Sequence, residues 1–133
     1  MDQPPTIVTA AVVERDGRLL VTRRLEGTHL AGCWEFPGGK CEGGEAPEPC
    51  LERELREELG VESTVGPEIH RTLYTYGGKV LDLRFFRCEI AGEPRPLLGQ
   101  EVRWVARAGL RDLRFPPADA ELVEMLSSRR PAQ

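Results

Sequence analysis

Three glutamates on one predicted helix face constrain this chain more than any other feature. Glu54, Glu57 and Glu58 stand at positions i, i+3 and i+4 of a segment with helical apolar spacing. An α-helix turns by about 100° per residue, so the three carboxylates fall within an arc of about 100°. Like charges at this spacing repel one another, and a helix face selected only for solubility would alternate its signs. The cluster therefore predicts a shared cation, and a hard divalent ion suits oxygen ligands best.

The residues around these glutamates form a longer pattern with fixed spacing. Five residues separate Gly39 from Glu45, and seven more precede the run that starts at Arg53. The whole segment, residues 39–61, reads GKCEGGEAPEPCLERELREELGV. It resembles the signature of the Nudix hydrolase family at every defined position. Residues 34–40, WEFPGGK, and 115–119, FPPAD, extend the resemblance to the MutT-like branch of that family.

Apolar periodicity and turn residues predict the order of the elements. Asp16 and Gly17 predict a hairpin turn after a strand that is apolar on both faces. In the main helix, Pro47 and Pro49 are tolerated because they fall in its first turn, and Gly60 predicts its end. The predicted elements are strands at residues 6–14, 18–24 and 34–36, a helix at 45–59, strands at 71–76, 79–90 and 101–106, and a helix at 117–128.

This order fits the fold class that the resemblance implies, an α/β/α sandwich with a mixed β-sheet between helices. Leu51, Leu55 and Leu59 form the predicted core stripe of the main helix. In the strand at 79–90 the apolar phase changes at Phe85 and Phe86, which predicts either a β-bulge or a strand covered on both faces. We expect residues 1–133 to form a single domain, with residues 1–5 and 129–133 flexible.

Charge and hydropathy narrow the class of partner. The formal net charge is -4, so no global basic field attracts a nucleic acid polymer, and a small anion complexed with metal is favoured. No apolar run reaches the length of about 18 residues that a membrane helix needs. The first residues lack the basic and apolar regions of a signal peptide, so we expect a cytoplasmic protein without membrane contact that is a monomer or a homodimer.

The four cysteines show no metal-ligand or redox spacing. Cys33, Cys41, Cys50 and Cys88 include no C-x-x-C pair. In a cytoplasmic protein this predicts four reduced thiols, with neither a zinc site nor a disulfide.

The resemblance implies a reaction and a catalytic set. Nudix hydrolases cleave a nucleoside diphosphate linked to a further group, with Mg²⁺, or Mn²⁺ in its place, as cofactor. The resemblance implies Glu57 and Glu58 as principal metal ligands, with Glu54 completing the site or polarising water and the Gly39 carbonyl as a further ligand. Arg53 is predicted to orient these glutamates. The MutT likeness implies hydrolysis of a nucleoside triphosphate to the monophosphate and pyrophosphate.

Substrate contacts follow from the same resemblance. It implies Arg24 at a phosphate, and Lys40 is a second candidate; surface roles are the alternatives. It implies Phe36 beside the base and Asp119 at the base edge, whereas Asp119 could instead only favour a helix N-terminus. An ionised carboxylate only accepts hydrogen bonds, which suits the cytosine N4 amine or the guanine N1 and N2 hydrogens. A small molecule of the nucleotide class is therefore expected, cytosine nucleotides or 8-oxo-dGTP, in cleansing the nucleotide pool.

The sequence departs from the family at one loop position and leaves two other functions open. Many MutT-like chains carry a glutamate six residues before the last strand's tryptophan, where this chain has Leu98, so Glu101 becomes a candidate metal ligand. Tyr74 and Tyr76 keep open a hydrolase of ADP-ribose or of dinucleoside polyphosphates. The alternative of another class is a Nudix-fold sensor that binds nucleotides without cleaving them.

Overall fold

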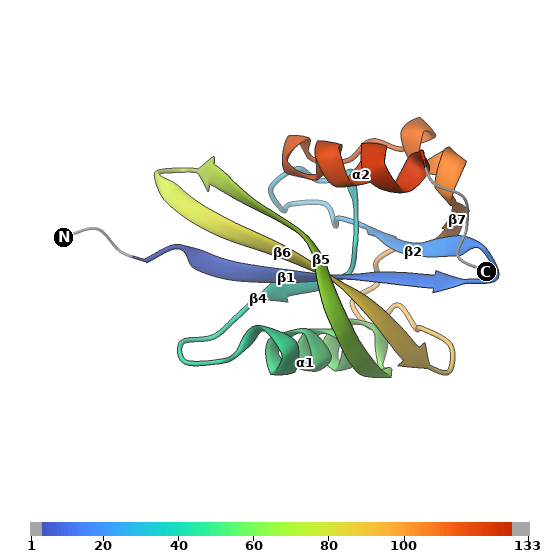
Figure 1. Cartoon of the computed structure of the whole chain (residues 1–133), viewed down its shortest axis with the longest axis horizontal. Coiled ribbons are helices and arrows are strands. Elements are labelled where there is room, and N and C mark those ends of the chain that lie inside the picture. The colour runs from blue at the N-terminus through green and yellow to red at the C-terminus, as the bar shows by residue number, and fades with distance from the viewer. Residues whose placement is uncertain (1–3, 129–133) are drawn as a thin grey trace.

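A seven-stranded mixed sheet lies between two α-helices in the computed structural model, which describes residues 4–128. Helix α1 (Pro47–Leu59) covers one face of the sheet and helix α2 (Ala120–Ser127) covers the other (Figure 1). This arrangement confirms the predicted α/β/α sandwich. Within the described residues no helix is both long enough and apolar enough to cross a membrane.

The sheet is built around β1, which has partners on both of its edges. β1 pairs in parallel with β6 and antiparallel with β2 and β4, and every other pairing in the sheet is antiparallel. The main strand order is β3 (Trp34–Glu35), β2 (Arg18–Arg23), β1 (Thr6–Arg15), β6 (Lys79–Ala91) and β5 (Glu62–Tyr76), with β4 (Gly38–Lys40) on β1 and β7 (Val102–Ala106) on β2.

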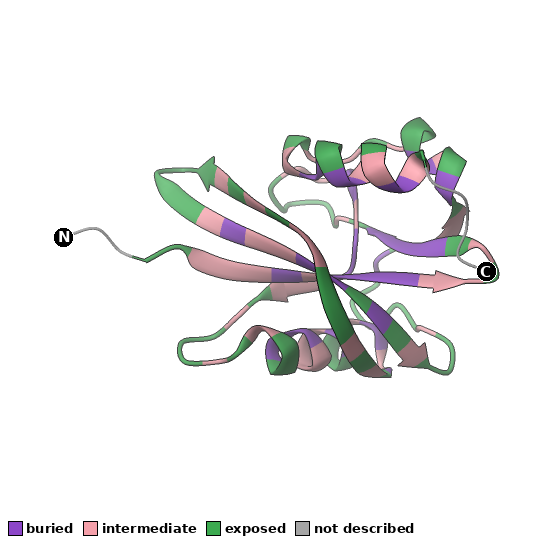
Figure 2. Ribbon diagram, viewed as in Figure 1, coloured by how far each residue is buried: buried purple, intermediate pink, exposed green. Residues whose placement is uncertain are grey.

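Two hydrophobic cores flank the sheet, and β1 contributes to both. Ala11 and Val13 pack into the core under α1, whereas Val12 packs into the core under α2. All three are buried, as Figure 2 shows for the centre of the sheet, and this confirms the prediction of a strand covered on both faces. Each buried aliphatic side chain contributes about 1.5–3 kcal/mol, so both helices are tied firmly to the sheet.

Both alternatives predicted at Phe85 and Phe86, a β-bulge and a strand covered on both faces, occur in the structure. Phe85 belongs to the core under α2 and Phe86 to the core under α1, so both faces of β6 are covered there. The partner strand β5 carries a register irregularity opposite them, because Phe86 faces Glu68 while Phe85 faces His70. The extra residue lies on β5, and it lets β5 continue past the phase change.

Helix α1 begins and ends as the sequence predicts to within two residues. Its prolines lie in the first turn, and Gly60 closes it in the left-handed conformation with φ 67°, its N–H donating to the Arg56 carbonyl at 3.0 Å. The predicted leucine stripe is buried. The helix starts at Pro47 and not at residue 45, so Glu45 lies outside it.

Three elements differ from the prediction. The glycines after Pro37 form strand β4, where the sequence indicated only a loop. A Cβ on Gly38 would overlap the Thr9 carbonyl, so glycine alone permits this close strand pairing. Strand β5 begins at Glu62 and not at the predicted residue 71. The sequence pattern did not indicate its first half because that half is an exposed edge without apolar alternation. The sequence contains no signal for the 3₁₀ helix at Arg107–Asp112. The helix predicted at 117–128 is present, but its first turn, Pro117–Asp119, is a 3₁₀ helix that leads into α2.

The prediction of four reduced thiols is wrong for two of them. Cys41 and Cys50 form a disulfide, with their Cα atoms 5.3 Å apart. Nine positions separate them in sequence, and only the return of α1 alongside β4 brings them together, so spacing alone did not reveal the pair. Cys33 and Cys88 are free and buried. Residues 1–3 and 129–133, predicted to be flexible, lie outside the described residues.

Candidate active site

The three glutamates of α1 differ in their exposure although they share one helix face. The Glu54 side chain is 16% exposed, whereas that of Glu57 is 58% exposed. Glu58 is partly buried and lines a cavity of about 520 Å³. The cluster therefore runs from a shielded interior, at Glu54 and Glu58, to a solvent-facing rim at Glu57.

Gly39 brings the backbone of β4 against this cluster. A Cβ at this position would lie 2.5 Å from the Glu54 carboxylate carbon, so any larger residue would displace that carboxylate. The missing side chain therefore lets peptide and carboxylate approach each other. This closeness supports the sequence prediction of the Gly39 carbonyl and the glutamates as ligands of one ion, and that assignment stays a prediction.

Arg53 holds the acidic groups in place. Its Nε and Nη2 donate to the two carboxylate oxygens of Glu45 at 2.8 and 2.9 Å, and its Nη1 lies 3.1 Å from both Glu54 and Glu57. A further contact runs from Nη2 to the Lys40 carbonyl at 3.3 Å. The hydrogen bonds from Arg53 are the main reason that the pKa of Glu45 is lowered to about 2. Arg53 thus connects the loop after β4 to the glutamates, as expected of a positioning residue.

The surroundings of Glu58 disfavour its ionised form and leave one of its carboxylate oxygens without a hydrogen-bond partner within the described residues. Burial, followed by the carboxylates of Glu54, Glu35 and Glu57, raises the pKa of Glu58 to about 8. Its Oε2 atom is buried and has no hydrogen-bond partner within the described residues. Burial also raises the pKa of Glu54, against the opposing effect of Arg53. A divalent cation would satisfy the orphaned oxygen and neutralise the cluster, so these residues fit the metal that the sequence predicts.

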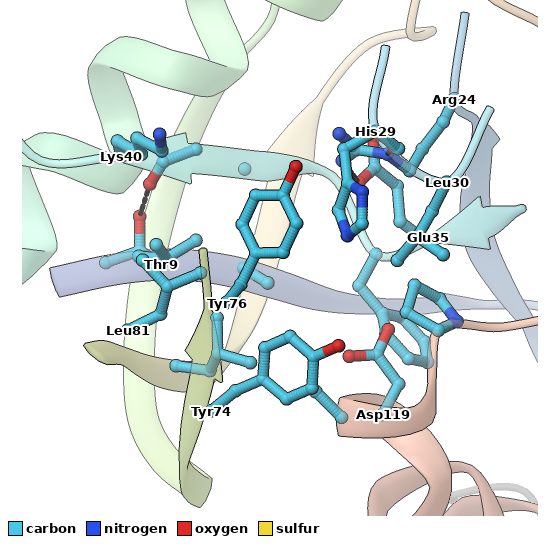
Figure 3. A pocket seen from close by; sticks show the side chains of 18 of the residues that line it. Thr9, Arg24, His29, Leu30, Glu35, Lys40, Tyr74, Tyr76, Leu81 and Asp119 are labelled. Carbon is cyan, nitrogen blue, oxygen red and sulfur yellow. Dashed lines mark hydrogen bonds and ion pairs between the residues drawn. The ribbon is translucent and has the colours of Figure 1, made fainter. Parts of the chain in front are cut away.

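Of the three glutamates, only Glu58 lines the cavity of about 520 Å³, which reaches Asp119 just before α2 (Figure 3). Arg24 lines it from the end of β2, with Nη1 2.8 Å from a carboxylate oxygen of Glu35 and Nε 2.6 Å from the His29 carbonyl. These two contacts fix the guanidinium at the cavity wall. Lys40 lines the same cavity from β4 and is exposed. Both cations predicted for phosphate therefore line the cavity that Glu58 also lines.

The far end of the cavity is lined by apolar side chains, the Asp119 carboxyl group and the Tyr74 hydroxyl. Phe36 is buried there, stacked on Phe115 with 5.4 Å between ring centroids. Asp119 lies at this end, 8% exposed, and Figure 3 shows the Tyr74 hydroxyl pointing towards it. Phe36 and Asp119, which the sequence assigned to the base, thus share one wall.

The protonation of Asp119 changes the argument about the base. Burial, followed by the charge of Glu35, raises the pKa of Asp119 to about 7, and Arg24 opposes this. The prediction for Asp119 assumed an ionised carboxylate, which only accepts hydrogen bonds. With this pKa about half of the molecules carry the proton near neutral pH, and a neutral carboxyl group both donates and accepts. A donating Asp119 is therefore not restricted to the cytosine N4 amine or the guanine N1 and N2 hydrogens.

The structure separates Glu101 from the predicted metal site. Its carboxylate lies 2.7 Å from Arg103 and 3.6 Å from Arg23, and of the two described cavities it lines neither. The residue that contacts α1 here is the neighbouring Gln100, whose Nε2 donates to the Glu58 carbonyl at 3.0 Å. The role of Glu101 as a substitute ligand stays a prediction, and the observed contacts do not support it.

Sequence reasoning missed Glu35 and the aromatic contact across the cavity. Glu35 lines the cavity and couples to both Glu58 and Asp119, and burial raises its own pKa. A charged residue between Trp34 and Phe36 in a strand was the available signal. Tyr76 stacks on His29 with centroids 3.8 Å apart, which joins the β5–β6 hairpin to the loop at residues 25–33.

Comparison with known proteins agrees with this geometry. The sequence profile of the NUDIX domain matches residues 8–125. An 8-oxo-dGTP diphosphatase of Haemophilus influenzae is 38% identical over 95% of this chain and 94% of its own length. A CTP pyrophosphohydrolase of Escherichia coli is 35% identical over 95% of this chain and 94% of its own. The solution structure of the Escherichia coli ORF135 protein superimposes with a TM-score of 0.82 at 35% identity, covering 96% of this chain and 94% of that one.

The chain therefore belongs to the Nudix family of hydrolases. Within it, the similarities place the chain among the MutT-like enzymes that cleave phosphoanhydride bonds of nucleotides. Nudix hydrolases generally use divalent metal ions.

Proposed function

We propose that this protein is a Mg²⁺-dependent nucleoside triphosphate pyrophosphohydrolase, with Mn²⁺ as a substitute, that releases a nucleoside monophosphate and pyrophosphate. The observation that carries the proposal is one cavity lined by Glu58, whose pKa burial raises, and also by Phe36 and Asp119. Its length and chemistry suit a nucleotide with its polyphosphate at the glutamates and its base at the far wall.

In this proposal the residues of α1 and β4 hold the metal. Glu54, Glu57, Glu58 and the Gly39 carbonyl offer the oxygen ligands that Mg²⁺ prefers. When bound, such an ion neutralises phosphate oxygens and acidifies a bound water. Because the pKa of Glu58 is about 8 without a cation, binding of positive charge releases the Glu58 proton and leaves a carboxylate in the cluster.

The other residues bind and orient the substrate. Arg24, fixed by Glu35 and the His29 carbonyl, presents a guanidinium to the phosphates, and Lys40 adds a second charge. Phe36 provides an apolar wall for the base. Arg53 keeps Glu54 and Glu57 aligned through its contact with Glu45 and does not itself line the cavity.

Cytosine nucleotides and 8-oxo-dGTP are the two substrate candidates within this function. The names of the similar enzymes include both, and Asp119 in its two protonation states can read either edge. A second function, hydrolysis of ADP-ribose or of dinucleoside polyphosphates, is favoured by Tyr74 and Tyr76, which line the cavity as two further stacking surfaces. Location in the cytoplasm, and assembly as a monomer or homodimer, stay predictions.

Product analysis tests the proposal directly. The protein is incubated with Mg²⁺ and CTP, dCTP, 5-methyl-dCTP, 8-oxo-dGTP, ADP-ribose or a diadenosine polyphosphate, and products are resolved by chromatography. Pyrophosphate and a monophosphate support the proposal. AMP with ribose 5-phosphate, or ATP from the dinucleotide, would support the second function instead. The Glu57→Gln variant, purified in parallel, controls for contaminating phosphatases.

A further inference from the structure

The Cys41–Cys50 disulfide joins the two elements that build the candidate metal site. Cys41 directly follows β4, and its N–H donates to the Ile7 carbonyl at 2.9 Å. Cys50 lies in the first turns of α1, and its N–H donates to the Ala46 carbonyl at 3.0 Å. The crosslink therefore connects the strand that carries Gly39 with the helix that carries the glutamates.

The two sulfurs lie in different surroundings. Cys50 is fully buried, with its Sγ 3.4 Å from the Thr9 hydroxyl and 3.9 Å from the Gly39 carbonyl oxygen. Cys41 is partly exposed and is followed by three exposed residues, 42–44. A thiol from solution can therefore approach Cys41, whereas Cys50 is protected inside the fold.

We propose that Cys41 and Cys50 form a reversible redox site, reduced by a dithiol, whose state changes the metal affinity of the neighbouring Gly39 carbonyl. The pair lies outside the residues that the proposed reaction uses. Its link to the metal rests on the proposed function, whereas the redox chemistry does not.

The exchange balances in two steps. A thiolate of the dithiol attacks Cys41 Sγ, forms a mixed disulfide and displaces the Cys50 thiolate, which takes up a proton. The second thiol of the reductant then attacks its own sulfur in that mixed disulfide and releases Cys41, which is protonated in turn. The protein gains two electrons and two protons, and the dithiol leaves as a cyclic disulfide.

Reduction changes what the Cys50 sulfur can do. In the disulfide this sulfur has no hydrogen, so it only accepts from the Thr9 hydroxyl. As a thiol it can donate to the Gly39 carbonyl oxygen, which already lies 3.4 Å from that hydroxyl. Two donors would then occupy the lone pairs that a metal ion needs. Reduction also releases the loop that holds Glu45, the main partner of Arg53.

Counting thiols tests the redox site itself. Protein purified without reductant is denatured and alkylated, and the labelled peptides are identified by mass spectrometry. We expect label at Cys33 and Cys88 alone, label at all four cysteines after dithiothreitol, and a return to two after the dithiothreitol is removed and oxidised glutathione is added. Label at all four cysteines before reduction, or failure of the pair to re-form, would overturn the proposal.

Manganese binding, followed by electron paramagnetic resonance, tests the link to the metal. We expect three- to tenfold weaker Mn²⁺ binding after reduction, and equal affinities in the two states would contradict the link. The Cys41→Ser variant keeps the Cys50 thiol, whereas Cys50→Ala has neither the crosslink nor a thiol at position 50. If the thiol acts on the carbonyl, Cys41→Ser binds Mn²⁺ more weakly than Cys50→Ala, and equal binding would contradict that step.

A further control separates this inference from the proposed function. The Cys33→Ala/Cys88→Ala variant should keep the full redox difference in Mn²⁺ affinity, and its loss there would contradict the assignment to Cys41 and Cys50. If neither redox state binds Mn²⁺, the proposed function fails while the thiol counts still decide the redox site.

Discussion

The two ends of the cavity are assembled in different ways. At the metal end, Glu54, Glu57 and Glu58 come from little more than one turn of α1, and Gly39 lies on the adjoining strand. At the base end, Phe36 and Asp119 come from distant parts of the chain and meet only in the fold. The metal end is rich in charge and held by Arg53, whereas the base end is lined by apolar side chains, the Tyr74 hydroxyl and one carboxyl group of variable protonation.

This difference teaches which properties each end can set. A local helical cluster fixes the distances between its carboxylates, so the chemistry of bond cleavage belongs to α1. A wall formed by separate elements can change one residue without disturbing the others, so the choice of base belongs to the far end. Substitutions at the two ends should therefore change different kinetic constants.

The largest effect should follow from removing one charge at the metal end. Glu57→Gln leaves an exposed side chain of similar shape, so the fold should persist while kcat falls by about 10³-fold or more. Steady-state kinetics and circular dichroism measure the two effects. Glu52→Gln, on the same helix but outside the cluster of Glu54, Glu57 and Glu58, is the matched control and should retain turnover. Near-normal turnover of Glu57→Gln would refute the metal assignment.

The next effect concerns the base end and the pH dependence of stability. The pKa of Asp119 is raised from 3.8 to about 7, so the folded state binds its proton more tightly than the unfolded chain does. The stability from this proton is fully present below about pH 4 and is lost as pH rises towards 7. In urea titrations without metal, Asp119→Asn should lose less stability over this range than the unmodified protein, by about 4 kcal/mol at most. If the free energies of unfolding of the two proteins change in parallel with pH, Asp119 has an ordinary pKa and the prediction is wrong.

A smaller effect should follow from weakening the support of the metal end. Arg53→Lys keeps the charge but loses the paired hydrogen bonds to Glu45. We expect Mn²⁺ affinity and kcat to fall by about 10- to 100-fold, as outer contacts of metal ligands commonly do. Arg56→Lys, an exposed position on the same helix, should leave both unchanged. A change in the KM for nucleotide alone would instead place Arg53 at the substrate.

The smallest effect is expected for Arg24, one of the two cations predicted to bind phosphate. Arg24→Lys removes the planar guanidinium that contacts Glu35 and the His29 carbonyl, so KM should rise by about tenfold with a lesser change in kcat. Arg23→Lys is the neighbouring control and should behave as the unmodified protein. If the two variants have equal KM values, Arg24 does not bind the phosphates.

The contrast between the ends also explains how much the sequence revealed. The glutamate face, the leucine stripe and the Gly60 helix end all depend on residues close in sequence, and each was predicted correctly as structure. The same holds for the turn at Asp16 and Gly17, where both residues have positive φ. Local rules and short-range spacing were sufficient for these features.

Features that depend on residues distant in sequence or on burial were not predictable. Strand β4 forms because Gly38 fits against Thr9, and the Cys41–Cys50 bridge forms because α1 returns beside β4. The pKa values of Glu58 and Asp119 depend on burial and on the Glu35 carboxylate, which belongs to a different part of the chain. Each of these requires the assembled sheet.

Anomalous diffraction from crystals soaked in Mn²⁺ tests the central claim most directly. The account predicts a manganese peak within about 2.1–2.3 Å of carboxylate oxygens of Glu57 and Glu58, with the Gly39 carbonyl in the same shell. The peak should disappear in Glu57→Gln crystals grown and soaked in the same way. A peak elsewhere, or full Mn²⁺-dependent turnover from a protein that shows no ion between these glutamates, would contradict the account.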